Sequence, residues 1–220
     1  DNDLETAAIA NFNQMEVVGS TKDVRVIVEM DRIPGYDQSN GDWSDTRRYL
    51  ITRDSDTNVM HSVRLDDPPL GEKNMGDWTT LKDFVDWGTQ QFPADHYCLI
   101  IWDHGNGWLV HSLSLGPQIN YIASDDTDSG GLDIMDIPKA LAGVRLDIVA
   151  FDACLMQELE VAYEIKDSAR YMVASPTPEP SPGYNYAALL RRIGATTSPE
   201  DFCKAVVGEY ARAYPPPYQG

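Results

Sequence analysis

Basic residues are scarce in this chain of 220 residues, which has 17 lysines and arginines against 35 aspartates and glutamates. The formal net charge of -18 at pH 7 argues against nucleic acid and anionic membranes as partners and favours cationic substrates. The sequence also contains no apolar run long enough to span a membrane and no signal peptide. These absences leave an acidic globular protein that is long enough to bury a sizeable core, and we expect a single domain over residues 1–220.

Cysteine is also rare, and the three that occur are an odd set too sparse for a disulfide framework. Cys98 falls inside a predicted strand and Cys203 on a predicted helix, so we expect both to be inert buried thiols. Cys154 differs from them because it directly follows the end of a strand. Any thiol chemistry is therefore expected at Cys154.

Strands and helices alternate along the chain. Short apolar runs predict strands at 24–30, 97–102, 146–151 and 170–175, with shorter, more polar ones at 49–52 and 59–65. Apolar residues three and four apart predict helices at 4–18, 79–91, 132–143, 155–165, 187–193 and 199–214, the second capped by Thr79 or Thr80. Loops are predicted at 34–45, over the irregular stretch 109–131 and in the proline-rich 176–182. This alternation predicts an α/β fold, a three-layer α/β/α sandwich with a mainly parallel sheet.

One thiol and one imidazole follow the ends of two predicted buried strands. His104 comes after the strand at 97–102, and Cys154 comes after the strand at 146–151, 50 residues on. That spacing permits adjacent parallel strands, whose carboxyl ends form the edge where ligands bind in open α/β sheets. A histidine held near a thiol can take its proton and later protonate a leaving amine. The sequence therefore predicts a Cys/His nucleophilic site.

Two further features would stabilise the negative charge that develops in such a reaction. The main-chain N–H groups of Gly105 and Cys154 are candidates for an oxyanion hole. The helix predicted directly after Cys154 would point its positive end at the same place. The alternative interpretation is that Cys154 is an ordinary buried cysteine and His104 a hydrogen-bonded loop histidine.

Metal sites have less support in the sequence. The acidic loop with Asp125, Asp126 and Asp128 suggests calcium, but an EF-hand loop would need a glutamate where Ile137 stands, which favours a solvated turn. Zinc is less well supported, because His96, Cys98 and His104 lie along one strand without the usual ligand spacing. We therefore expect no metal or other cofactor, with calcium as the alternative.

Several blocks of sequence resemble those of the clostripain family of cysteine peptidases, which have a caspase-like fold. They are IIWDHGNGW at 100–108, FDACLMQELEVAYE at 151–164 and, within 171–186, YMVAS and EPSPGYNY. The amino-terminal helix and following strand resemble the family's as well, so the similarity spans nearly the whole chain. The resemblance implies a secreted or cell-envelope bacterial endopeptidase with Cys154 as nucleophile and His104 as its partner. It also implies a peptide or protein substrate, cut after arginine or lysine.

The same resemblance implies an acidic pocket for the basic side chain of the substrate. Asp152 matches one pocket acid of the family, although a strand-end aspartate can also cap the next helix. In some members a second acid precedes the glycine that is Gly183 here, and this sequence has Pro182 instead. Glu179 offers a carboxylate from the same loop, with a solvated loop carboxylate as the alternative. Ser175, from the same block, is the third predicted substrate-binding residue.

The resemblance further places the family's first strand before Asp1 and further segments after the last helix. We therefore keep a second hypothesis, in which this core is a catalytically silent peptide-binding or regulatory module. A third, a metal-dependent hydrolase, would lose activity with a chelator but not on thiol alkylation. The presence of both His104 and Cys154 favours the peptidase.

Overall fold

The structure, a computed structural model, describes residues 1–108 and 121–215. The chain divides into two compact units, of which the first comprises Asp1–Lys73 with Pro180–Gly220 and the second Asn74–Glu179. We call them unit 1 and unit 2. None of the described helices combines the length and the apolar composition needed to cross a membrane.

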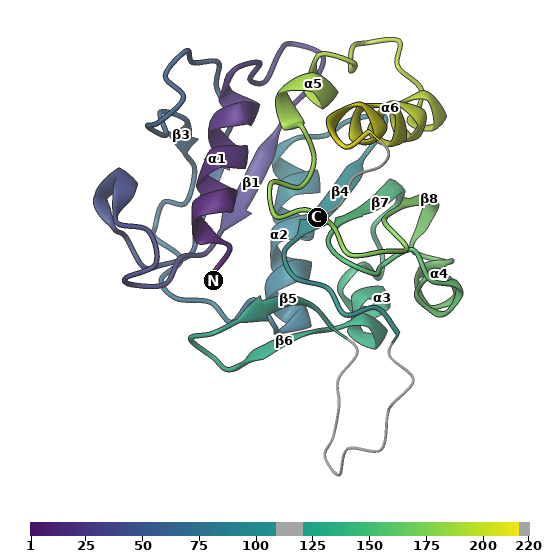
Figure 1. The fold of residues 1–220 in the computed structure, drawn as a ribbon, viewed down its shortest axis with the longest axis horizontal. Coiled ribbons are helices and arrows are strands. Elements are labelled where there is room, and N and C mark those ends of the chain that lie inside the picture. The colour runs from purple at the N-terminus through teal and green to yellow at the C-terminus, as the bar shows by residue number, and fades with distance from the viewer. Residues whose placement is uncertain (109–120, 216–220) are drawn as a thin grey trace. The chain divides into compact units, whose positions relative to one another are not determined.

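Unit 1 combines a small antiparallel sheet with helices from both ends of the chain (Figure 1). The sheet has the strand order β1-β2-β3, with bounds β1 Ile27–Met30, β2 Arg47–Leu50 and β3 Val63–Arg64. The helices are α1 Glu5–Glu16, the 3-10 helix η1 Ser39–Gly41, α5 Tyr186–Leu190 and α6 Pro199–Ala213. The predicted helices and the predicted antiparallel pair near residues 49 and 63 are thus confirmed, within a few residues at their ends.

Helix α1 supplies much of the core of unit 1. Its buried Ile9 and Phe12 pack with Met30, Trp43, Tyr49 and Ile51. The helix ends at Glu16, and the chain turns away at Gly19, whose N–H donates to the Met15 carbonyl at 2.8 Å. The φ of +70° at Gly19 suits glycine, and a Cβ there would lie 2.3 Å from the backbone nitrogen of Arg53. The predicted stop at Gly19 is therefore confirmed.

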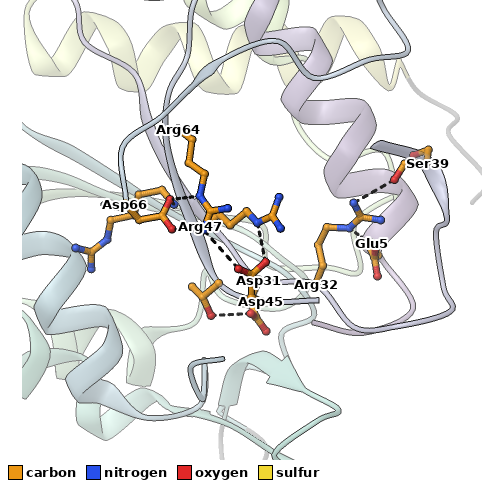
Figure 2. Close-up of polar contacts among 10 residues, drawn as sticks. Glu5, Asp31, Arg32, Ser39, Asp45, Arg47, Arg64 and Asp66 are labelled. Atoms are coloured by element: carbon orange, nitrogen blue, oxygen red, sulfur yellow. Dashed lines mark hydrogen bonds and ion pairs between the residues drawn. The ribbon is translucent and has the colours of Figure 1, made fainter. Parts of the chain in front are cut away.

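Unit 1 also contains an ion pair with almost no access to water (Figure 2). The guanidinium of Arg32 donates to Glu5 at 2.5 Å and to the main-chain oxygen of Ser39, and both charged side chains are at most 1% exposed. The Trp43 ring lies 4.7 Å from the same guanidinium. A buried charge of this kind is tolerated only because it is paired and hydrogen-bonded.

Unit 2 is built on a parallel sheet with the strand order β4-β7-β8 (Figure 1). Its strands are β4 Cys98–Trp102, β7 Leu146–Asp152 and β8 Ala169–Val173, and a hairpin is formed by β5 Tyr121–Asp125 and β6 Gly130–Asp133. The helices are α2 Trp78–Gln91, the 3-10 helix η2 Ile134–Asp136, α3 Ile137–Ala140 and α4 Leu159–Ile165. The predicted strands at 97–102, 146–151 and 170–175 are confirmed as a parallel set.

The middle strand explains why this sheet is stable. Every residue of β7 except Asp147 is buried, and Val149, Ala150 and Phe151 are fully inaccessible. Burying a valine or phenylalanine side chain contributes roughly 2 kcal/mol. The apolar run therefore fixes β7 in the centre of the sheet, which is the position that presents its carboxyl end to both neighbours.

Three predictions about unit 2 are wrong. The predicted helix at 132–143 begins later, because Leu132 pairs with Ile122 in the hairpin and only η2 and α3 follow. Helix α2 is capped by Asp77, whose carboxylate accepts the N–H of Thr79, instead of by Thr79 or Thr80. Cys98 is exposed at the start of β4 and not buried.

Candidate active site

The register of the parallel sheet brings the predicted thiol and imidazole together. Trp102 of β4 pairs with Asp152 of β7, and the next N–H, that of Asp103, donates to the Asp152 carbonyl at 3.3 Å. His104 and Cys154 each lie two residues beyond that pair. Because neighbouring strands are about 4.8 Å apart, the two residues leave the same edge of the sheet side by side.

The loop that carries His104 is fixed to strand β5. The His104 carbonyl accepts the N–H of Ala123 at 3.0 Å, and Gly105 forms an isolated bridge with Ile122. Asn106 and Tyr121 exchange two hydrogen bonds, one through the Asn106 side chain at 2.7 Å and one between main chains at 3.1 Å. The hairpin, which the sequence did not predict, therefore holds the histidine loop in place.

Glycine is required in this loop because it passes directly over the chain around Cys154. A Cβ on Gly105 would lie 2.6 Å from the Cys154 carbonyl oxygen and 3.1 Å from the Ala153 Cβ. Gly107 has a φ of +60°, and a Cβ there would lie 2.6 Å from the Leu155 carbonyl. The spacing G-N-G after the histidine is thus a packing requirement of the site.

Cys154 is half-buried and contacts the loop that follows β8. Its sulfur accepts the N–H of Glu179 at 3.2 Å. The next residue, Leu155, has a φ of +63°, a strained value for a residue with a side chain, and its N–H donates to the Thr177 carbonyl at 3.3 Å. Cys154 therefore sits on a sharp turn whose shape is fixed by contacts distant in sequence.

This turn changes one of the predicted sources of charge stabilisation. Helix α4 begins at Leu159 and not at Leu155, so the helix end predicted directly behind Cys154 is absent, and that prediction is wrong. The main-chain N–H groups of Gly105 and Cys154 remain available, since neither donates a hydrogen bond within the described residues. The oxyanion hole predicted from these two groups stays a prediction.

Two carboxyl groups lie beside the thiol. Asp152 is 4% exposed at the end of β7, and Glu179 is half-buried, with its Oε2 buried and without a hydrogen-bond partner among the described residues. Burial, followed by the negative charge of Asp152, raises the pKa of Glu179 to about 10. At neutral pH Glu179 therefore holds a proton beside Asp152. The interpretation of Glu179 as a solvated loop carboxylate is wrong.

Asp152 does not cap a helix. The first helix after it is α4, whose N-cap position is Glu158, six residues further on. The helix-cap interpretation of Asp152 is therefore wrong.

The sequence model of the clostripain family matches residues 1–218. This chain belongs to the clostripain family. It is 31% identical to clostripain of Hathewaya histolytica over an alignment 224 residues long, which covers 91% of this chain and 42% of that protein. The chain thus spans less than half of that curated relative, and the resemblance predicted from its sequence blocks is confirmed.

Solved structures agree with this assignment. A secreted C11 cysteine protease from Bacteroides thetaiotaomicron, in complex with an irreversible peptide inhibitor, matches with a TM-score of 0.75 and 27% identity, over 97% of this chain and 56% of that chain. An inactive zymogen C11 protease from Parabacteroides distasonis matches with a TM-score of 0.72 at 21% identity, over 97% of this chain and 56% of that one, and shows the fold alone. The caspase-like α/β fold predicted from the sequence is therefore confirmed.

Within this clostripain-family domain, Ser175 has a defined structural task. It is buried, and its hydroxyl donates to the Thr177 carbonyl at 2.9 Å and accepts the Thr177 N–H at 3.2 Å. Its carbonyl accepts the N–H of Gln157 at 2.9 Å. Ser175 thus shapes the loop that leads to Glu179, while its predicted contact with substrate stays a prediction.

The acidic turn that suggested calcium connects β5 and β6, and Asp126 and Asp128 are exposed on it as a solvated turn requires, whereas Asp125 is buried. Asp125 is 1% exposed, and its two oxygens accept the N–H groups of Met75 at 2.7 Å and Asp128 at 2.9 Å. These hydrogen bonds give Asp125 a structural explanation, and the calcium alternative stays a prediction. The part of the irregular stretch at 109–120 lies outside the described residues.

Sequence reasoning missed Glu158. Its carboxylate accepts the N–H of Trp108, which lies in the histidine loop and 50 residues away. The signal was present in the block CLMQE, which places an acid four residues after Cys154, but a helix predicted from Leu155 would have turned that acid to solvent.

Proposed function

We propose that this chain carries the catalytic centre of a cysteine endopeptidase that cleaves after arginine or lysine. The observation that carries the proposal is the β4-β7 register, which sets His104 and Cys154 two residues beyond one pair of strand ends. Membership of the clostripain family supports the same conclusion.

The proposed reaction follows from the residues around the thiol. His104 takes the proton of Cys154, and the sulfur attacks the carbonyl carbon of the scissile peptide bond. The N–H groups of Gly105 and Cys154 bind the resulting oxyanion. His104 then protonates the leaving amine as the carbon–nitrogen bond breaks. Water, deprotonated by His104, hydrolyses the thioester and releases the acid product and the free thiol.

The preference for a basic side chain is proposed from the buried carboxyl pair of Asp152 and Glu179. A guanidinium or ammonium group there would pair with the carboxylate of Asp152. Once Glu179 loses its proton, the same group would pair with two carboxylates. Glu179 would then take the place of the acid that some family members have at the position of Pro182. A neutral substrate side chain would form no ion pair with Asp152, so it should bind less well.

The peptide substrate and the location of the protein are proposed from relatives. A secreted C11 cysteine protease has been solved with a peptide inhibitor, and we infer that this chain also acts on peptides or proteins outside the cell. The rival hypothesis of a silent peptide-binding module predicts peptide affinity without turnover, which the following experiment separates.

The test is hydrolysis of fluorogenic peptides that differ only in the residue before the scissile bond: arginine, lysine, aspartate, asparagine or leucine. The full-length protein should cleave after arginine and lysine, and Cys154→Ala should abolish cleavage. Cys98→Ala is the matched control, because Cys98 is exposed and lies at the opposite end of its strand from His104.

Each outcome decides between the hypotheses. Full turnover by Cys154→Ala would disprove the thiol mechanism. Cleavage after another residue would retain the Cys/His mechanism and reject the role given to Asp152 and Glu179. Binding of the arginine peptide without cleavage by the mature protein would favour the silent module.

A further inference from the structure

Glu158 makes an unusual contact for a residue at the start of a helix. It occupies the N-cap position of α4, yet its side chain caps no N–H of that helix. Its carboxylate instead accepts the main-chain N–H of Trp108 at 2.5 Å. An N-cap side chain normally stabilises its own helix, so this carboxylate serves a different part of the chain.

The contact lies four residues after His104, in the loop that follows β4. Gly107, the residue before Trp108, is buried and approaches so closely that a Cβ on it would lie 2.7 Å from Glu158 Oε2. The same Cβ would lie 2.6 Å from the Leu155 carbonyl. The loop after β4 and the turn after β7 are therefore joined at this point by one side chain.

The described part of the histidine loop, residues 103–108, is thus fixed at two points by different partners. Near its start, Gly105 lies against Cys154 and bridges Ile122 of the hairpin. Further along, Trp108 is held by Glu158, four residues after Cys154. Both partners belong to unit 2, so the arrangement is internal to one compact part of the chain.

We propose that Glu158 is a positioning residue that keeps the His104 loop in register with the Cys154 turn. The inference rests on the proposed Cys/His mechanism, because it assigns Glu158 to no other reaction. Glu158 touches neither reacting group. It acts by accepting one hydrogen bond that fixes where the imidazole stands relative to the sulfur.

The geometry makes a specific demand on the side chain at this position. An acceptor oxygen is needed, whereas a negative charge is not, because the donor is a neutral main-chain N–H. Glutamine therefore substitutes for Glu158, and methionine, of similar length but without the acceptor, does not. If Glu158 only fills space, the glutamine and methionine variants should behave alike.

The experiment compares Glu158→Gln, Glu158→Met and Glu158→Ala in the full-length protein, with the exposed Glu160→Ala as matched control on the same helix. With the arginine peptide, the methionine and alanine variants should lose about 100-fold in kcat with little change in KM, because misplacing a catalytic group by 1 Å costs about that much. Glutamine should retain activity within about threefold of the parent, as Glu160→Ala should.

A second readout reports on the thiol and imidazole without substrate turnover. In a Cys98→Ser background, the rate of Cys154 alkylation by iodoacetamide is followed from pH 5 to 9. A histidine held beside the thiol sustains alkylation well below pH 8.5, where an isolated thiol ionises. The methionine variant should lose this low-pH reactivity and the glutamine variant should keep it.

The outcomes separate this inference from the proposed function. Parent-like kcat and alkylation in Glu158→Met, with Cys154→Ala inactive, would overturn the positioning role alone. Activity in Cys154→Ala would overturn the proposed mechanism itself. If Glu158→Ala does not fold, the comparison of the glutamine and methionine variants still tests the positioning role of Glu158.

Discussion

At the scale of single residues, the buried proton on Glu179 is the most informative feature of the site. Its pKa is raised from 4.5 to about 10 by burial and by the charge of Asp152. A carboxyl group that stays protonated at neutral pH weakens the negative charge beside Cys154. It also provides a proton that an incoming cation displaces. Two measurable consequences follow, one for folding and one for binding.

The first consequence concerns stability. Because folding raises the pKa of Glu179, the folded state binds a proton that the unfolded state lacks between about pH 4.5 and 10. The stabilising effect is complete below pH 4.5 and is lost as the pH rises toward 10, so this group makes the free energy of unfolding fall with pH. Glu179→Gln should flatten that slope, measured by urea unfolding from pH 5 to 9. Glu160→Gln, on an exposed side chain, should leave it unchanged; identical slopes in all three proteins would refute the buried proton.

The second consequence concerns cation binding. When a guanidinium enters beside Asp152 and Glu179, it favours the ionised pair and the proton is released, so binding should tighten as the pH rises. The inhibition constant of n-butylguanidinium should fall by up to about tenfold per pH unit between pH 6 and 9, since alkylguanidinium stays charged throughout. In Glu179→Gln the constant should vary little with pH. A pH-independent constant in the parent would show that the cation does not bind at this pair.

At the scale of elements, the site depends on how closely the loop after β4 can cross the turn after β7. Gly105→Ala places a Cβ 2.6 Å from the Cys154 carbonyl oxygen, a backbone atom that cannot move without displacing Cys154, the proposed nucleophile. We expect kcat/KM to fall about 100-fold, with the far-UV circular dichroism unchanged. Gly130→Ala is the control, because a Cβ on this exposed hairpin glycine meets nothing within 4 Å. Similar activity in both variants would contradict the tight crossing.

The strands that form the sheet of unit 2 were predictable because their signal is local. The runs at 97–102 and 146–151 are short, apolar and followed by polar residues, and they became β4 and β7 in the expected parallel pair. Their carboxyl ends then fixed the places of His104 and Cys154. The core of the candidate site could therefore be inferred from two strand ends alone.

The elements that were missed depend on contacts between distant residues. Helix α4 begins late because Leu155 is held at positive φ by the Thr177 carbonyl, and nothing in the local sequence reports that bond. The β5-β6 hairpin was predicted as irregular chain because its acidic turn resembles a solvated loop, whereas Asp125 is buried by bonds to Met75 and Asp128. The contact of Glu158 with Trp108 spans 50 residues and was invisible for the same reason.

At the scale of the whole molecule, the prediction of a single domain becomes a question of cooperativity. The chain divides into two compact units, and a single domain requires that they unfold together. Tryptophan positions make this measurable, because Trp43 is in unit 1 and the other four of the five tryptophans are in unit 2. A Trp43→Phe protein therefore reports on unit 2 alone through its tryptophan fluorescence.

The perturbation should be placed in unit 1, at the buried Arg32–Glu5 pair (Figure 2). Arg32→Ala leaves Glu5 buried without its countercharge, which costs about 3–5 kcal/mol and lowers the Tm of a chain of this size by about 10 °C. If the chain is a single domain, the midpoint temperature of the unit 2 fluorescence transition, measured in the Trp43→Phe background, falls by the same amount. Arg25→Ala, which changes an exposed arginine, should change neither the Tm nor the midpoint of the fluorescence transition. The contrary result is a fluorescence transition that stays at the parent temperature while circular dichroism shows helix being lost at a lower temperature. Units 1 and 2 would then unfold separately, and the single-domain prediction would be wrong.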